Sequence, residues 1–210
     1  MHVQTFTDNK SFIHKSAQII IEACTQEKSC IGLSGGKTPI PIYRELTPQD
    51  VASAQLYMLD ERYVPDSDPR SNVHTISMAL PHVPIENFDT SLPIEQSLAA
   101  YSKKLPEMFT LCILGIGTDG HVTSLFPHSP ALTEKKNVAH TTTNILDVRD
   151  RLTVTFPLIV SSKKILLVAA GKSKKQIIDD LLHSNKTTDE LPAKKLLGHP
   201  NITIHYLQSV

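Results

Sequence analysis

Glycine is scarce in this chain, and its distribution points to two loops where backbone groups approach a ligand. Six of the eight glycines lie in two short segments, one with Gly32, Gly35 and Gly36, the other with Gly115, Gly117 and Gly120. Each loop follows an apolar stretch typical of a buried strand. Ligands of open α/β sheets bind where strands end, and glycine lets backbone amides come close to them. We therefore expect both loops to face one crevice.

The first loop, Ser34-Gly35-Gly36-Lys37-Thr38, has the composition of an anion site. It offers two hydroxyl groups and several free N–H groups, and a helix is predicted to begin just after it. The N–H groups at a helix N-terminus favour anions, of which phosphate is the usual one. The alternative is a plain turn between strand and helix that binds nothing.

The second loop runs Gly115-Ile116-Gly117-Thr118-Asp119-Gly120-His121 and matches G-x-G-x-x-G, the dinucleotide fingerprint. That fingerprint requires a following helix and an acidic residue at a strand end about 20 residues on, and neither is visible here. Instead His121 follows at once, and Asp119 can accept a proton from its ring and fix the tautomer. We predict a general base at His121, supported by Asp119; the alternative is a histidine that only stabilises its own turn.

Further charged residues are candidates for the same crevice. Asp60 and Arg62 belong to a charged triplet that we expect at the end of the second strand, although a solvated surface cluster is the alternative. Lys174 lies at the start of a predicted helix, where a cation opposes the helix dipole, so a bound anion would explain it. Arg151, just before a predicted strand, is a further candidate.

No metal and no cofactor are predicted. The other histidines are scattered, and we expect them at the surface; none forms a His-x-x-x-His pair, and the chain has no Cys-x-x-Cys pair of the kind found in zinc sites. The three cysteines, Cys24, Cys30 and Cys112, lack the paired spacing of a disulfide framework. Cys112 lies in an apolar run, which predicts a buried thiol.

Charge and hydropathy argue against several classes of partner. Lys+Arg and Asp+Glu both number 21, whereas nucleic-acid binders usually carry a basic excess. No apolar stretch approaches the roughly 20 residues that span a bilayer, and the polar residues 1–10 do not resemble a signal peptide. We therefore expect a cytoplasmic protein that binds a small molecule and needs no nucleic acid, membrane or obligate protein partner.

The elements that must position these residues alternate between helices and strands. Apolar spacing, capping residues and prolines predict helices over residues 12–24, from residue 39, from residues 71–72, over 94–105 and over 173–182. Short apolar runs predict strands over residues 30–33, 55–59, 111–114, 152–156, 165–170 and 202–206. Residues 135–150 are polar and are predicted to form a loop.

Several of these strands are apolar on both faces, which is typical of a parallel sheet buried between helices. The chain shows no internal repeat, low-complexity segment or linker. We therefore predict an α/β protein with a three-layer Rossmann-like fold, a mostly parallel sheet with helices on both faces, and one domain over residues 1–210.

Four segments, in order, resemble the family of 6-phosphogluconolactonases and glucosamine-6-phosphate isomerases. They are residues 34–39, residues 60–65 with Ser71-Asn72, residues 115–127 and residues 171–174. The Asp-Gly-His loop followed by Ser-Leu-Phe-Pro is the most specific of them. One departure is Thr123, which stands where the family usually has a smaller alanine.

The resemblance implies hydrolysis of 6-phospho-D-glucono-1,5-lactone in the oxidative pentose phosphate pathway. Carried over by position, His121 would be the base and Asp119 its support, while Arg62, Lys174 and residues 34–38 would hold the phosphate. Asp60, Gly117, Gly120 and Arg151 would complete the substrate site.

Two alternatives stay open at this point. One is a glucosamine-6-phosphate deaminase, but those relatives carry a Glu five residues after the histidine, where this chain has Phe126. The other is a non-catalytic sugar-phosphate sensor, which would have no need of a paired histidine and aspartate.

Overall fold

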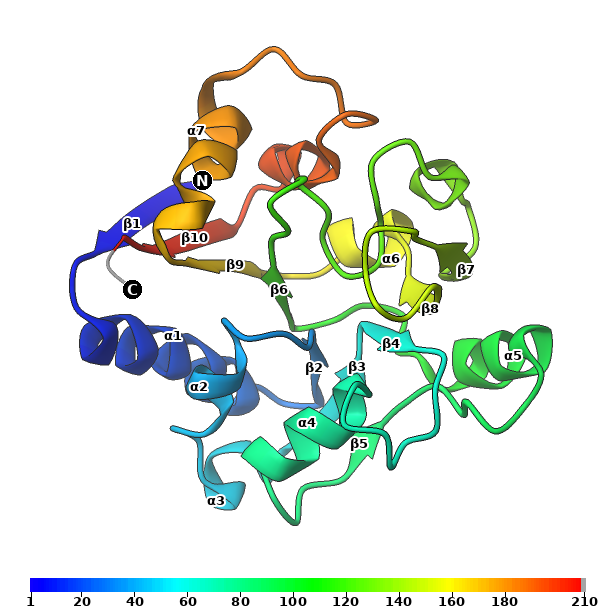
Figure 1. Cartoon of the computed structure of the whole chain (residues 1–210). Coiled ribbons are helices and arrows are strands. Elements are labelled where there is room, and N and C mark those ends of the chain that lie inside the picture. Colours follow the sequence, from blue (N-terminus) through cyan, green and yellow to red (C-terminus); the bar gives the residue numbers. More distant parts are fainter. Residues whose placement is uncertain (209–210) are drawn as a thin grey trace.

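A seven-stranded parallel sheet forms the centre of the computed structural model, which describes residues 1–208 (Figure 1). In spatial order its strands are β1 (His2–Phe6), β10 (Ile202–Leu207), β9 (Ile165–Ala170), β6 (Leu111–Gly115), β2 (Ser29–Leu33), β3 (Ala54–Met58) and β5 (Ile85–Glu86). All six pairings between neighbours are parallel. The predicted sheet is confirmed, while the last two residues of the predicted domain lie outside the described residues.

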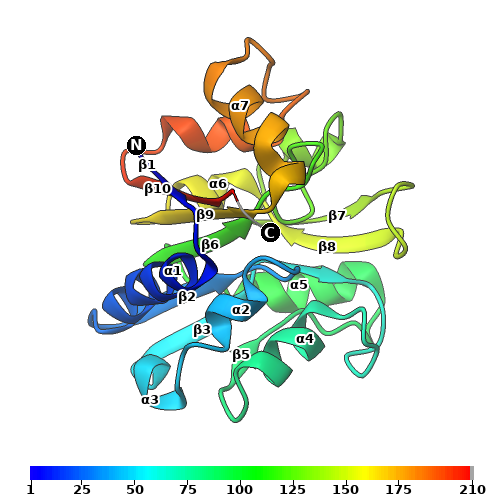
Figure 2. The same cartoon turned by 60° about the vertical axis from the view of Figure 1, so that its left-hand side comes forward.

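Helices cover both faces of this sheet. One face packs against α1 (Asn9–Cys24), α2 (Ile40–Tyr43), α3 (Pro48–Val51) and α4 (Asn72–Ala79). The other packs against α5 (Ile94–Lys104), α6 (Phe156–Val160), α7 (Lys175–His183) and the 3-10 helix η3 (Pro192–Gly198). Figures 1 and 2 show α1 and α7 on opposite sides of β9 and β10. Within residues 1–208, none of the helices has the length and apolar character needed to cross a membrane.

Side chains alternate between the two cores along each central strand. In β6, Leu111 and Ile113 pack into the core that contains α1, whereas Cys112 and Leu114 pack into the core that contains α6 and α7. All four are fully buried. Because helices cover both faces of the sheet, the sequence of β6 is a continuous apolar run. The predicted burial of Cys112 is confirmed.

A second, antiparallel sheet contains β4 (Asp60–Arg62), β8 (Asp150–Val154) and β7 (Val138–Thr142), with β8 in the middle. The prediction that Asp60 and Arg62 end the second strand of the main sheet is therefore wrong. Leu59 is where the chain changes sheets: its N–H donates to Leu33 O (2.8 Å), while its carbonyl accepts from Val154 N (2.7 Å).

The second sheet also explains two other errors. Residues 135–150, predicted as a loop, contain β7, whose polar side chains alternate with buried ones and whose backbone pairs with β8. The strand predicted over 152–156 stops at Val154, because Thr155 is the N-cap of α6 and Pro157 occupies the first turn of that helix. A pairing partner outside the segment decides the first outcome, and the local start of a helix decides the second.

Two further elements differ from the sequence prediction. The edge strand β1 was not predicted, since its short run is polar and mostly exposed. The helix predicted over 173–182 begins with a 3-10 turn, η2 (Lys172–Lys174), before α7. By contrast, the helices predicted from residues 12, 71 and 94 are present as α1, α4 and α5.

The expectation that all other histidines lie at the surface is wrong for two of them. His199 is buried and its Nε2 lies 2.7 Å from Ser162 O, while buried His205 places Nδ1 2.8 Å from Ser16 Oγ. Burial lowers the pKa of His205 to about 4, so this ring is neutral inside the fold. Each histidine joins elements far apart in the chain, which no local pattern reveals.

Candidate active site

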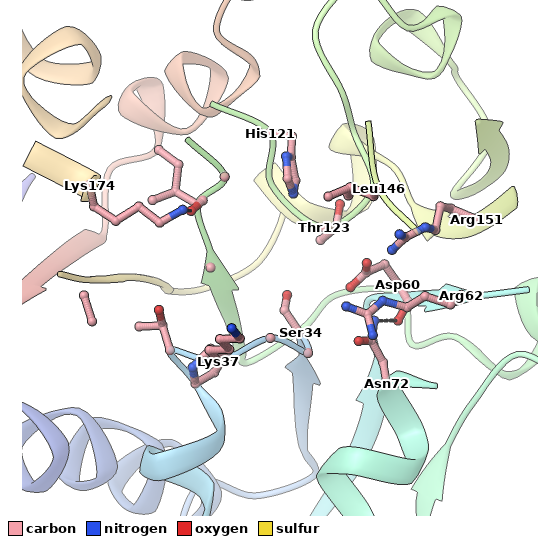
Figure 3. A pocket seen from close by; sticks show the side chains of 18 of the residues that line it. Ser34, Lys37, Asp60, Arg62, Asn72, His121, Thr123, Leu146, Arg151 and Lys174 are labelled. Carbon is pink, nitrogen blue, oxygen red and sulfur yellow. Dashed lines mark hydrogen bonds between the residues drawn. The ribbon is translucent and has the colours of Figure 1, made fainter. Parts of the chain in front are cut away.

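A pocket of about 400 Å³ lies where β2 and β6 end, between the two sheets (Figure 3). The predicted site residues that line it are Ser34, Gly35, Gly36, Lys37, Thr38, Asp60, Arg62, Gly117, His121, Arg151 and Lys174. Asp119 and Gly120 are not part of its lining and support the loop from behind. The fold therefore brings segments from five separate parts of the chain to one cavity.

His121 and Asp119 form a close pair at one wall of this pocket. His121 Nδ1 lies 2.6 Å from Asp119 Oδ1, which also accepts the backbone N–H of His121 (3.2 Å). Burial opposes ionisation of Asp119, but the hydrogen bond and charge of His121 outweigh it and lower the pKa of the carboxyl. Because a carboxylate only accepts, the proton belongs on Nδ1, and Nε2 is left as an acceptor. The side chain points into the pocket (Figure 3).

The glycines of this loop make room for the pair. A Cβ on Gly117 would lie 2.2 Å from His121 Nδ1 and 2.4 Å from Asp119 Oδ1. Gly120 has a φ of +88°, a left-handed conformation that favours glycine, and a Cβ there would meet Leu191 at 2.9 Å. The G-x-G-x-x-G spacing thus serves a histidine–aspartate pair.

The first loop presents polar groups to the pocket. The Ser34 hydroxyl is buried and has no hydrogen-bond partner in the described part of the chain. Gly36 adopts a φ of +104°, and a Cβ on Gly35 would collide with Asn72 Oδ1 at 1.9 Å. Tyr43 Oη donates to Ser34 O (3.0 Å) and anchors the loop to α2. Lys37 is exposed and adds a cation to the pocket lining.

Glu61 joins β4 to the start of α4 beneath the pocket. Its buried carboxylate accepts from Arg62 N (2.7 Å), Asn72 N (2.6 Å), Val73 N (2.7 Å) and Ser71 Oγ (3.1 Å). Burial raises the pKa of Glu61 to about 7, although the three backbone N–H donors favour its charged form. The arrangement fixes Arg62 and Asn72 in the pocket wall, and Asn72 Nδ2 also donates to Asp60 O (2.9 Å).

The second sheet supplies a charged wall. Asp60 is buried and its Oδ2 accepts from Ser124 Oγ (2.8 Å). Arg151 is also buried, and its Nε donates to Val148 O (2.8 Å). Burial and the neighbouring charge of Arg62 lower the pKa of Arg151. The negative charge of Asp60 raises this pKa and so partly offsets the two effects. Arg62, Arg151 and Asp60 lie together on one side of the pocket (Figure 3).

Lys174 occupies the opposite side from Arg62 (Figure 3). Its Nζ donates to Ile116 O (2.7 Å), the first residue after β6. Burial lowers the pKa of Lys174, while the charge of Asp119 raises it. The ammonium group therefore reaches across to the His121 loop, which explains its unfavourable place at a helix start without requiring an anion.

Several pocket residues were not predicted as site residues, namely Pro39, Asn72, Gly115, Ile116, Thr123, Leu146, Ala170 and Ser173. The sequence indicates Ser71 and Asn72 as capping residues and as part of the family resemblance; the N-cap is Ser71, whose Oγ accepts from His74 N, and Asn72 faces the pocket. Leu146 reaches the pocket from the connection between β7 and β8, a position with no sequence signal. Among residues 1–208, no three His, Cys, Asp or Glu side chains are grouped as metal ligands.

The chain is similar in sequence and in fold to proteins of one family. A family model described as glucosamine-6-phosphate isomerases/6-phosphogluconolactonase matches residues 7–204. A probable 6-phosphogluconolactonase of Dictyostelium discoideum is 33% identical over 195 residues, which cover 84% of this chain and 83% of the relative. The crystal structure of 6-phosphogluconolactonase from Thermotoga maritima superposes with a TM-score of 0.87 at 27% identity and 99% coverage of both chains.

The fold alone does not separate the activities within this group. The structure of a monomeric glucosamine-6-phosphate deaminase also superposes with a TM-score of 0.87, at 22% identity, and covers 99% of this chain and 97% of its own. The residues of the pocket must therefore carry the distinction.

Proposed function

Because the chain belongs to the glucosamine-6-phosphate isomerase/6-phosphogluconolactonase family, we propose that it hydrolyses 6-phospho-D-glucono-1,5-lactone to 6-phosphogluconate. The observation that carries the proposal is the His121–Asp119 pair, with a 2.6 Å contact, at the wall of a pocket that also presents cations. A lactone is an internal ester, and its hydrolysis needs an activated water and a proton for the leaving oxygen. Neither step calls for a metal or a redox cofactor.

In the proposed mechanism, neutral His121 accepts a proton at Nε2 from a water that attacks the lactone carbonyl. Asp119 holds the proton on Nδ1 and stabilises the imidazolium that forms. The imidazolium then protonates the ring oxygen as the C–O bond breaks, which restores the neutral base. Backbone N–H groups of the glycine-rich loops are the candidate donors to the oxyanion.

The phosphate is proposed to bind at the Ser34–Thr38 loop, with Arg62 and Lys174 as cationic partners. The Ser34 hydroxyl, which has no hydrogen-bond partner among residues 1–208, and the positive φ of Gly36 support an anion at this loop. Lys174 and Arg62 flank the loop from opposite sides of the pocket (Figure 3). Asp60 and Arg151 are proposed to contact the sugar.

Phe126 argues against the deaminase alternative. Its ring centroid lies 4.8 Å from that of His121, at the position where the deaminases carry a glutamate. Phenylalanine cannot exchange a proton, so it cannot assist the opening of an amino-sugar ring. The site therefore favours lactone hydrolysis over deamination.

The decisive assay uses freshly made 6-phosphogluconolactone and follows acid release, corrected for spontaneous opening. We expect protein-dependent hydrolysis that survives extended chelation. A parallel incubation with glucosamine 6-phosphate measures ammonia and fructose 6-phosphate. Sustained release of both products at a comparable rate, or loss of hydrolysis on chelation with recovery on adding one divalent ion, would contradict the proposal.

The cationic partners give a separate prediction. Arg62→Ala and Lys174→Ala should each weaken binding of the phosphorylated lactone by about 10- to 150-fold, because a charge-assisted hydrogen bond contributes roughly 1.5–3 kcal/mol. Hydrolysis of the unphosphorylated lactone should change little. The measurement is kcat/KM on both substrates. An equal loss on both would assign that residue to the sugar or to the structure of the site.

A further inference from the structure

Thr123 adopts a backbone conformation that its side chain disfavours. Its φ is +52°, in the left-handed region, which is unusual for a β-branched residue. The residues from Val122 to Leu125 form a turn closed by Leu125 N donating to Val122 O (2.9 Å). Thr123 holds the first central position of this two-residue turn, where a positive φ is normally adopted by glycine, asparagine or aspartate.

The side chain of Thr123 is held firmly in the pocket wall. Its Oγ1 donates to Val122 O (2.6 Å) and lies 3.0 Å from Thr153 Oγ1, in the middle strand of the second sheet, whose one proton is shared between Thr123 Oγ1 and Val154 O. A hydroxyl group has one proton and two acceptor positions. In the described part of the chain, no second donor reaches this oxygen, so one acceptor position remains open.

Thr123 lies in the same pocket as the proposed base. Thr123 is only 8% exposed, and it lines the same pocket as His121. Figure 3 shows both side chains projecting from one loop into the cavity, with Asp60 beyond Thr123. Strained residues persist where the surroundings hold them, and such positions are common at functional sites.

We propose that Thr123 is a positioning residue that accepts a hydrogen bond from the attacking water. A water that gives one proton to His121 Nε2 has a second proton to place, and Thr123 Oγ1 offers an acceptor beside the base. Holding both protons directs an oxygen lone pair toward the lactone carbonyl. The inference rests on the proposed lactone hydrolysis.

The first test compares Thr123→Val with Thr123→Ser. Valine keeps the β-branched shape without the hydroxyl, and we expect it to lower kcat by about 2- to 12-fold, the effect of one hydrogen bond. Serine should restore most of the rate, and KM should hardly change in either variant. Thr118→Val, an exposed substitution in the same loop, is the matched control and should behave as the parent.

The second test separates strain from chemistry by thermal unfolding of Thr123→Gly and Thr123→Ala. Both lack the hydroxyl, but only glycine relieves the left-handed conformation. We expect the glycine variant to melt about 1–4 °C above the alanine variant, the reverse of the usual order. Both should show the kcat loss of the valine variant.

Three results would overturn the proposal. They are an unchanged kcat in Thr123→Val, failure of serine to restore the rate, and a raised KM at constant kcat, which would place the hydroxyl on a substrate group. An alanine variant more stable than the glycine variant would remove the strain argument. A parent protein that does not hydrolyse the lactone would instead contradict the proposed function itself.

Discussion

Replacing His121 with alanine is expected to lower kcat by about 10²- to 10⁴-fold, the usual contribution of a general base. His121 is proposed to supply the base because its Nδ1 is held by Asp119 at 2.6 Å, while the rest of the ring faces the pocket. The variant should still bind 6-phosphogluconate, since the proposed phosphate partners are untouched.

A second histidine–aspartate pair provides the control for this experiment. His128 Nδ1 lies 2.5 Å from Asp189 Oδ2, but both side chains are largely exposed and neither lines the pocket. His128→Ala should therefore leave turnover unchanged. Near-normal turnover of His121→Ala, or equal losses in the two variants, would refute the assignment of the base.

Substituting Gly117 with alanine should reduce kcat by about 10²-fold, although it removes no catalytic group. Its new Cβ would approach His121 Nδ1 and Asp119 Oδ1 to 2.2 and 2.4 Å, so both must move. A displacement of about 1 Å at a catalytic group can cost that factor. The measurement is single-turnover hydrolysis, with circular dichroism to verify that the variant is folded.

Gly198→Ala is the matched control, because a Cβ at this exposed position in η3 meets no atom within 4 Å. It should keep the parent rate and melting temperature. If Gly117→Ala kept the parent rate as well, the close packing of the loop around the pair would have no part in catalysis.

Much of the main sheet follows from local pattern. The apolar runs of β2, β6 and β9 are buried on both faces. Such a run predicts a buried strand even when its neighbouring strands are unknown. The amphipathic spacing of α1 and the Ser71 cap of α4 are equally local. These features depend on residues within a few positions of one another.

The His121–Asp119 pair could also be predicted from the sequence. The two residues are separated by a single glycine, so a tight loop brings their side chains together whatever the remainder of the fold does. Only the tertiary structure shows that Gly117 and Gly120 leave space for this pair, since the same spacing also fits a dinucleotide loop.

The second sheet could not be predicted in the same way. Asp60 and Arg62 reach the pocket because the chain leaves the main sheet at Leu59 and pairs with β8, about ninety residues later. β7 forms from a polar segment because β8 offers it backbone partners. Glu61 and Asn72 connect β4 to the start of α4: Asn72 N donates to Glu61, and Asn72 Nδ2 donates to Asp60 O.

The sequence by itself therefore determined the parallel α/β sheet, the two glycine-rich loops at its strand ends and the histidine–aspartate pair. Only the tertiary structure decided which charges face that pair: Arg62 and Arg151 on one side, Lys174 on the other. The physical reason is the range of the interactions. The spacing of apolar residues, helix capping and tight turns depend on residues that are close in the sequence. Strand pairing depends instead on the sum of many contacts between distant segments.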